Sequence, residues 1–319
     1  MKWLEALLLG LVQGVTEFLP VSSDGHLKVT QSLLDLANGR TTSGEDALFF
    51  DIVLHIGTFL AILIYYRSVA LKSARGLLKI EPADPVYNRN IVIRACILAT
   101  IATLPLIPYA ILKKRLEAAF ESLTITGCGF LVTAAALLIT YKLSGGNKGP
   151  REMKWHDALL IGIAQAFAPL PGVSRSGMTI ATALALGLDR GWSVGFSLLI
   201  AIPAIAGASV FAIKDFDPGS MQADAYAPMI AGAVVAGVVG YFAISWLAQV
   251  VRGGKLWYYS VYLVFLGFAV IAWGLAGGDR RGAKSTGVIA VDRAPGIERS
   301  RSVDRTTDVQ VSRAHGLDF

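Results

Sequence analysis

Long apolar stretches separated by short polar segments make up most of this chain. A helix crosses a bilayer with about 20 consecutive apolar residues. Stretches of that order lie near residues 48–66, 91–112, 123–141, 193–213, 227–251 and 257–276. The pattern therefore predicts an all-α, polytopic bundle of membrane-spanning helices.

Two shorter apolar stretches, 3–19 and 157–170, each run into proline and small polar residues. Proline cannot continue the hydrogen bonds of a helix, and glycine loosens it. Non-helical backbone at membrane depth is tolerated only where protein or a wet cavity covers it. We expect both stretches to enter the membrane, break inside it and turn back. A signal peptide is the alternative for 3–19, but Glu5, Gln13 and Glu17 interrupt that stretch.

The two short stretches also resemble each other. Met1–Gln13 matches Met153–Gln165 at a constant offset of 152, with eight of thirteen positions identical, Trp, Gly and Gln among them. This register predicts a duplication, with one repeat over about 1–141 and the other over 153–276. Paired interrupted segments in two repeats point to a site near the membrane midplane.

Composition narrows the class of protein further. Apolar residues make up 54% and charged residues 16% of the chain, and the mean hydropathy is +0.56. A soluble globular protein would carry about 25% charged residues. The net charge of +6 does not require nucleic acid as a partner. Cys96 and Cys128 both lie in apolar runs, which does not favour a disulfide framework or a zinc site. The polar, aperiodic segment 279–319 is expected to be a disordered tail without a catalytic role.

The first polar cluster follows the first short stretch. Gln13 and Glu17 lie four residues apart, on one face of a helix. An acidic side chain at membrane depth is costly, so Glu17 is expected to face a wet cavity, a metal or a cation. The alternative is an interfacial glutamate that reaches water near a helix end. The break then supplies two hydroxyls, a carboxylate and an imidazole, on Ser22, Ser23, Asp24 and His26. One serine could instead be the N-cap of a helix that begins near Leu27.

The second polar cluster is Pro171–Thr179, which opens into another apolar helix. Arg175 stands between Ser174 and Ser176 at the expected helix start. Free N–H groups and the helix dipole favour anions there, and a guanidinium matches phosphate oxygens bidentately. The alternative is a cytoplasmic turn whose arginine anchors the interface. Both clusters together predict a membrane protein that handles a phosphorylated or anionic substrate inside the bilayer.

At these motifs the chain resembles the undecaprenyl-diphosphate phosphatase family of the bacitracin-resistance type. The family has a [Glu/Gln]-x-x-x-Glu helix leading into Pro-Val-Ser-Ser-x-Gly-His, and a later Pro-Gly-x-Ser-Arg-Ser-x-x-Thr. Here these are Gln13 to Glu17, Pro20 to His26, and Pro171 to Thr179. The resemblance covers residues 1–276. It implies an inverted-repeat fold with two re-entrant helix pairs, in the bacterial inner membrane.

The resemblance also implies an activity. Family members hydrolyse a polyprenyl diphosphate to the monophosphate, which recycles the lipid carrier for cell-wall synthesis and confers bacitracin resistance. A divalent metal ion, Mg or Ca, is implied, with Glu17 as its ligand. The partners implied are the lipid substrate and the bilayer, and a homodimer is compatible with the pattern. The implied catalytic residues are Glu17, Ser23, His26 and Arg175, and the implied substrate-binding residues are Gln13, Ser22, Asp24, Ser174, Ser176 and Thr179.

Several alternatives stay open at this point. The nucleophile could be Ser23, His26 or an activated water. Asp24 stands where many members have Thr or Ser, and we hypothesise that it offsets the carboxylate missing at Gln13. Asp51 and His55, four residues apart, could support the site or be ordinary interfacial polar residues. The competing function is a secondary transporter or lipid flippase, because paired broken helices are transporter features too. A phosphatidic-acid-type phosphatase is disfavoured, since its motifs are missing from the sequence.

Overall fold

The computed structural model describes residues 2–39, 44–80, 87–108, 122–143, 145–215 and 223–279. Within these ranges the chain is helical, and the one isolated β-bridge joins Lys148 and Leu188. The predicted all-α class is therefore confirmed for these residues. The predicted tail 279–319 lies outside the described residues, apart from Asp279.

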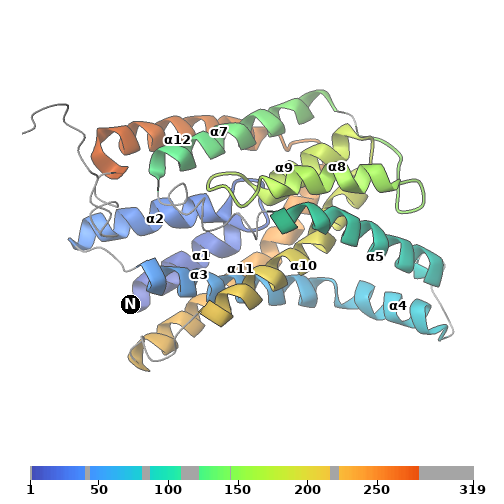
Figure 1. The fold of residues 1–319 in the computed structure, drawn as a ribbon, viewed down its shortest axis with the longest axis horizontal. Coiled ribbons are helices and arrows are strands. Elements are labelled where there is room, and N and C mark those ends of the chain that lie inside the picture. The colour runs from blue at the N-terminus through green and yellow to red at the C-terminus, as the bar shows by residue number, and fades with distance from the viewer. Residues whose placement is uncertain are drawn as a thin grey trace, which may run out of the picture. The chain divides into compact units, whose positions relative to one another are not determined.

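Figure 1 shows the helices in their order along the chain. In order they are α1 (Trp3–Thr16), α2 (Ser23–Asn38), α3 (Gly44–Tyr65), α4 (Arg67–Leu78), α5 (Arg89–Thr103), η2 (Leu104–Leu106), α7 (Leu123–Ile139), η3 (Thr140–Lys142), α8 (Trp155–Ala166), α9 (Arg175–Ala185), α10 (Arg190–Asp215), η5 (Ala223–Ala225), α11 (Tyr226–Arg252), α12 (Tyr258–Trp273) and η6 (Gly274–Gly278).

Five helical segments among the described residues are long and apolar enough to cross a membrane. They comprise α5 with η2, α7 with η3, α10, α11, and α12 with η6. The described part of α3 passes the same test only together with α4, and the two are bent by 62°. These segments agree with the six long apolar stretches of the sequence.

The helix pair α1 and α2 forms an antiparallel hairpin. At its open end, the Asn38 side-chain amide donates to the Glu5 carboxylate at 3.4 Å. Along its length α1 packs on α11 so closely that a Cβ on Gly10 would collide with the carbonyl of Gly232. Because α1 has 14 residues and α11 has 27, α1 ends well before α11 does.

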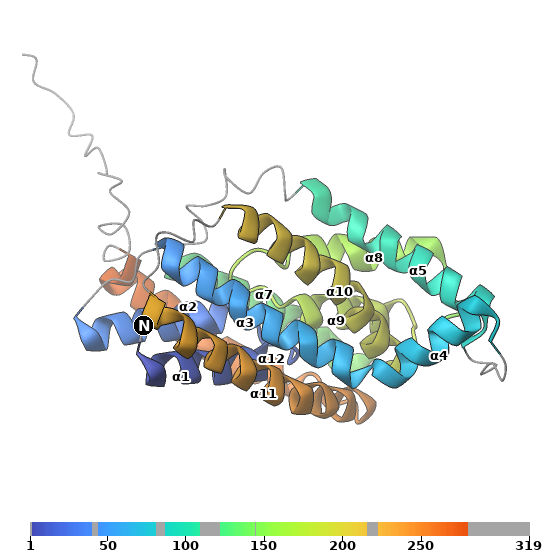
Figure 2. The same cartoon turned by 90° about the horizontal axis from the view of Figure 1, so that it is seen from below.

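The helix pair α8 and α9 repeats this arrangement. The Lys148 amide donates to the Gly187 carbonyl at 3.2 Å, so the end of α9 returns to the segment that precedes α8. Helix α8 packs on α5, with Gly162 against Ala102. Gly162 is the residue that the duplication aligns with Gly10. Figures 1 and 2 show α8 beside α9 and α5 in both views.

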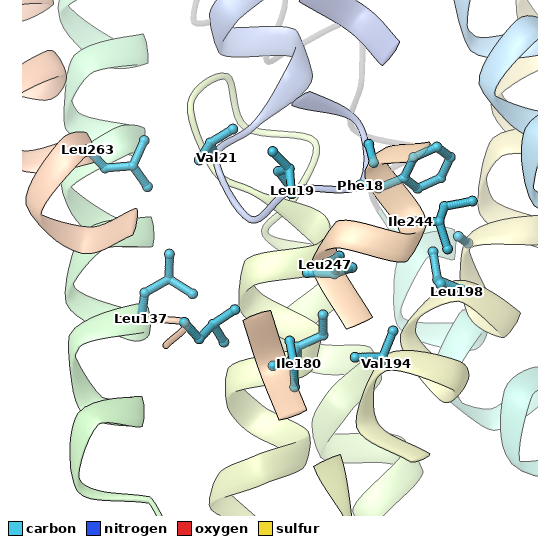
Figure 3. Packing of buried hydrophobic residues seen from close by; sticks show 14 of the residues in the cluster. Phe18, Leu19, Val21, Leu137, Ile180, Val194, Leu198, Ile244, Leu247 and Leu263 are labelled. Carbon is cyan, nitrogen blue, oxygen red and sulfur yellow. The ribbon is translucent and has the colours of Figure 1, made fainter. Parts of the chain in front are cut away.

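The first bend packs into the same apolar core as α9 and α11. Phe18, Leu19 and Val21 of the first bend belong to the same buried cluster as Ile180 of α9 and Leu247 of α11. Figure 3 shows Leu19 and Val21 on the looped chain between α1 and α2, with Phe18 beside Ile244. This packing holds the polar residues next to the bends in place.

Candidate active site

The site is centred on an ion pair between the two hairpins. Glu17 is the C-cap of α1, and Arg175 is the first residue of α9. Arg175 Nη2 donates to Glu17 Oε1 at 2.9 Å, and the two side chains are 14% and 4% exposed. Buried charges persist when they are paired and hydrogen-bonded. The two motifs that sequence analysis placed in one site therefore meet directly.

The second oxygen of Glu17 faces donors from its own hairpin. Ser23 Oγ donates to Oε2 at 2.7 Å, and Gln13 Nε2 donates to the same oxygen at 3.2 Å. The Gln13 contact confirms that the four-residue spacing puts both side chains on one face. A hydroxyl that donates to a buried carboxylate can pass its proton to that carboxylate when it attacks an electrophile.

Helix α2 begins at Ser23, so the expected start near Leu27 is wrong. Ser22 is the N-cap, and its Oγ accepts from the Gly25 amide at 3.4 Å. Ser22 reaches this position with φ of 72°, a left-handed conformation that is uncommon for residues other than glycine. The early start places Ser23, Asp24 and His26 in the first turn of α2. The sequence signal for this start was the serine pair itself, which offers two N-cap positions.

His26 is held at the flank of the site. Its Nδ1 lies 2.8 Å from the Ser22 carbonyl oxygen, so Nδ1 carries the proton. Its Nε2 then accepts from the Tyr262 hydroxyl of α12 at 2.7 Å. The imidazole is stacked on the Tyr262 ring and meets Phe130 of α7 edge-on. Sequence analysis missed Tyr262, which is one of several aromatic residues within an apolar stretch.

A third element, α3, adds His55 to the site. His55 Nε2 lies 3.4 Å from Glu17 Oε2 and 3.6 Å from Asp24 Oδ1, while Nδ1 donates to the Asp51 carbonyl. The Asp51 carboxylate accepts from Gln31 at 2.8 Å. Asp51 and His55 were the pair whose role sequence analysis left open. His55 lies in the site, whereas the Asp51 side chain contacts Gln31 of α2.

The remaining predicted residues build the start of α9. Ser174 is the N-cap and accepts from the Gly177 amide at 3.1 Å, and its own amide donates to Thr133 of α7 at 2.9 Å. Ser176 Oγ donates to the Leu19 carbonyl at 3.2 Å. Thr179 donates to the Arg175 carbonyl at 2.8 Å. Ser176 thus ties the start of α9 to the first bend, while Ser174 and Thr179 bond within α9. Thr133, on another helix, had no signal in the sequence.

Two buried polar atoms at the centre of the site lack a partner within the described part of the chain, Arg175 Nη1 and Gln13 Oε1. An unpaired guanidinium N–H in a buried position leaves a donor for an anion that enters the site. The positive end of the α9 dipole favours an anion as well. The site can therefore bind a phosphate group beside a hydroxyl and a carboxylate.

The donors suit a metal ion only in part. Among the described residues, no group of three or more His, Cys, Asp or Glu side chains is arranged to hold a metal ion. Glu17 and Asp24 are nevertheless close enough to share His55. Mg²⁺ is commonly bound by one or two carboxylates together with substrate phosphates. The residues present fit an ion that the diphosphate shares with the protein, rather than an ion that the protein holds alone.

Comparison with known proteins shows which family this chain matches. The model of the family described as Bacitracin resistance protein BacA matches residues 6–269. The undecaprenyl-diphosphatase of Carboxydothermus hydrogenoformans is 35% identical over 280 residues, covering 87% of this chain and 99% of that protein. The undecaprenyl-diphosphatase of Bacteroides thetaiotaomicron is 38% identical, with 85% and 98% covered. Undecaprenyl-diphosphatase 4 of Bacillus thuringiensis strain Al Hakam is 36% identical, with 85% and 97% covered.

Proposed function

Because the chain belongs to the bacitracin resistance protein BacA family, a family of multi-pass bacterial membrane proteins, we propose that it hydrolyses undecaprenyl diphosphate to undecaprenyl phosphate and inorganic phosphate. The observation that carries the proposal is the buried contact of Ser23 and Arg175 with the same carboxylate, Glu17. A transporter or flippase needs an anion site, but it has no use for a hydroxyl bonded to a buried base. The undecaprenyl-diphosphatase relatives also favour the enzyme.

In the proposed reaction Arg175 and the start of α9 bind the terminal phosphate. Arg175 Nη1 is the free donor, while Nη2 stays on Glu17. The α9 amides and the guanidinium stabilise the negative charge that develops on the phosphate oxygens during transfer. A divalent ion bound to the diphosphate would neutralise charge on the same oxygens, with Glu17 and Asp24 as its protein ligands.

We assign the attack to Ser23. Its Oγ forms a bond to the terminal phosphorus and gives its proton to Glu17 Oε2, which already accepts from it at 2.7 Å. The bond between that phosphorus and the bridging oxygen breaks, and undecaprenyl phosphate leaves with the electron pair. Glu17 passes its proton to the departing phosphate and becomes a carboxylate again. It then takes a proton from a water that attacks the phosphoserine phosphorus, the bond between that phosphorus and Ser23 Oγ breaks, and Glu17 returns the proton to Ser23 Oγ as inorganic phosphate leaves. His26 is the second candidate nucleophile, because its Nε2 carries a lone pair. In this structure that lone pair accepts a hydrogen bond from the Tyr262 hydroxyl.

Trapping the phosphorylated enzyme distinguishes the two nucleophiles. Phosphoserine survives acid, whereas phosphohistidine does not. With a labelled terminal phosphate, we expect an acid-stable phosphoprotein that Ser23→Ala abolishes and His26→Ala retains. An acid-labile adduct on His26 would contradict the assignment to Ser23.

The function itself is tested by phosphate release from undecaprenyl diphosphate in detergent. We expect release by the purified full chain, loss of release in Arg175→Ala, and loss of release on chelation. Hydrolysis that persists in Arg175→Ala would count against this site. A protein that binds the lipid but releases no phosphate would favour the transporter.

The two hairpins support a further proposal, that residues 1–141 and 153–276 are inverted repeats. Helix α1 packs on α11 as α8 packs on α5, and a Cβ on either of the aligned glycines Gly10 and Gly162 would collide with the backbone of the partner helix. In a re-entrant arrangement both hairpins end inside the bilayer, where their bends meet. The homodimer stays a prediction.

A further inference from the structure

A hydroxyl on α7, outside both polar clusters, contacts the backbone just before α9. The Thr133 side chain is fully buried, and its Oγ1 accepts from the Ser174 amide at 2.9 Å. The hydroxyl proton has two carbonyl acceptors at 3.1 Å, those of Gly172 and Gly129. Gly172 and Ser174 belong to the second bend, residues 167–174, which joins α8 to α9. Thr133 therefore fixes the second bend to α7 through a polar group.

The backbone of the second bend lies directly against α7. A Cβ on Gly129 would collide with the Pro171 carbonyl, and a Cβ on Gly172 would collide with the Thr126 carbonyl. Ser174 is only 1% exposed in this contact. A buried backbone N–H needs an acceptor within the protein when water cannot reach it. For Ser174 that acceptor is the Thr133 hydroxyl.

The amide that Thr133 holds belongs to the residue before Arg175. Ser174 is the N-cap of α9, so its position sets where α9 begins. On the other side of Arg175, Ser176 donates to a carbonyl of the first bend at 3.2 Å. Arg175 thus starts between two fixed residues, and from there its Nη2 reaches Glu17 at 2.9 Å. A displacement of about 1 Å at such a group can lower a rate about a hundredfold.

The same face of α7 also contacts the first hairpin. Phe130 lies three residues before Thr133, a spacing that puts both side chains on one face of a helix. The Phe130 ring meets the His26 ring edge-on, with ring centroids 5.1 Å apart. A Cβ on Gly25 of α2 would lie 2.6 Å from the Phe130 ring. Helix α7 is therefore a common support for the two helix starts that carry the site.

We propose that Thr133 is a positioning residue for Arg175. Its hydroxyl bonds to backbone groups, holds the Ser174 amide against α7 and so places the guanidinium between Glu17 and the terminal phosphate. Without this hydroxyl the buried Ser174 N–H loses its acceptor, so the second bend shifts until the N–H finds another. The proposal rests on the proposed function, because Arg175 is the group that binds phosphate there.

Thr133→Val tests this role, because it removes the hydroxyl and keeps the branched shape, including the methyl that faces Gly177. We expect kcat/KM for undecaprenyl diphosphate to fall about tenfold or more. Thr133→Ser keeps the hydroxyl and should retain most of the activity. Thr126→Val is the matched control, since Thr126 is also fully buried in α7 but donates to the carbonyl of Ser122, the N-cap of α7 itself. It should leave kcat/KM unchanged.

A double variant shows whether Thr133 acts through Arg175. Residues that act through one contact have non-additive effects. Thr133→Val should therefore cause little further loss of kcat/KM when it is added to Arg175→Lys. General damage to the fold would instead lower kcat/KM by the same factor in both backgrounds.

A binding measurement without turnover separates this proposal from the proposed function. The probe is farnesyl methylene diphosphonate, a non-hydrolysable ligand, added to the purified full chain. Thr133→Val should weaken its binding by about threefold or more, and Thr133→Ser should not. If the unsubstituted protein binds this probe but releases no phosphate from undecaprenyl diphosphate, the proposed function fails, and the binding data decide the role of Thr133.

Each remaining outcome decides the proposal. Undiminished kcat/KM and probe binding in Thr133→Val, an equal loss in Thr126→Val, or a full further loss in the Arg175→Lys background overturns it. An unsubstituted protein that neither binds the probe nor releases phosphate overturns both proposals. If Thr133→Val does not fold, Thr133→Cys replaces it, because a thiol is a weak acceptor, and a smaller loss in the same direction is expected.

Discussion

Glu17 is the residue on which the other groups of the site converge. Arg175 occupies one of its oxygens, and Ser23 and Gln13 occupy the other, with His55 at 3.4 Å. Only 7% of the residue is exposed, so these partners replace water as its solvation. A change in any partner therefore alters both the charge balance and the position of the carboxylate.

Arg175→Lys separates charge from geometry. Lysine keeps the positive charge but carries all its donors on one nitrogen, so it cannot place separate N–H groups where Arg175 Nη2 contacts Glu17 and where Nη1 is free for a phosphate oxygen. We expect kcat/KM for undecaprenyl diphosphate to fall by about a hundredfold or more. Arg151→Lys, at an exposed arginine before α8, is the control and should have no effect. Full activity in Arg175→Lys would show that charge alone suffices.

Asp24 provides a prediction about the metal. Its side chain is 55% exposed and lies beside His55, so a carboxylate oxygen remains available to an ion that arrives with substrate. Asp24→Thr and Asp24→Asn should both raise the concentration of Mg²⁺ needed for half-maximal activity. The measurement is a metal titration of phosphate release. Titration curves that coincide with that of the unsubstituted protein would remove Asp24 from the metal site.

Among the helices, the start of α2 is held by a close approach at Gly25. A Cβ there would lie 2.6 Å from the Phe130 ring and 3.0 Å from the Gly172 backbone. Gly25→Ala should therefore push Ser23 away from Glu17 and lower both Tm and activity. Gly207→Ala in α10 is the control, because a Cβ there meets nothing within 4 Å. It should leave both quantities intact or raise Tm slightly. Equal behaviour of the two variants would contradict the tight packing at Gly25.

The end of α12 is tied to the start of α7 through Asp279. Its carboxylate accepts from the Leu123 amide at 2.6 Å, Thr124 Oγ1 at 2.7 Å and Ser122 Oγ at 3.1 Å. Partial burial would raise the pKa of Asp279, but these hydrogen bonds outweigh it and hold the pKa below the usual 3.8. A carboxylate with a depressed pKa stabilises the folded state above the unfolded pKa and loses that contribution as pH falls through the folded value.

Asp279→Asn should consequently lower Tm at neutral pH by about 2 °C. The difference from the unsubstituted protein should shrink as pH falls below 3.8, the usual aspartate value. Thermal unfolding in detergent across this pH range measures it. A difference that stays constant down to the lowest pH would show that the charge of Asp279 contributes nothing.

For the whole molecule, the contacts of the polar residues differ in how far the sequence predicts them. Gln13 and Glu17 were paired correctly because helical spacing is a local property. Glu17 and Arg175 were placed in one site because both follow a broken helix in repeated segments. Tyr262 lies 236 residues from His26, and nothing in its surroundings separates it from other lipid-facing aromatics. Such contacts depend on how distant helices pack, which apolar periodicity leaves undetermined.

The proposed inverted repeats make a prediction for the entire fold. Asn38 lies at the open end of one hairpin and Lys148 at the open end of the other. In a chain whose Cys96 and Cys128 are replaced by Ala, a cysteine at position 38 and one at position 148 should react with an impermeant thiol reagent from opposite sides of the membrane. Labelling of both from one side would exclude inverted repeats.

The ion pair at the centre of the site has a consequence for biosynthesis. Arg175 follows Glu17 by 158 residues, so the segment that carries the Glu17 carboxylate is synthesised long before the Arg175 guanidinium that pairs with it. Until the second hairpin is inserted, the carboxylate must stay hydrated, protonated or sheltered by the insertion machinery. We therefore expect the first hairpin to take its final position only after the second has been translated.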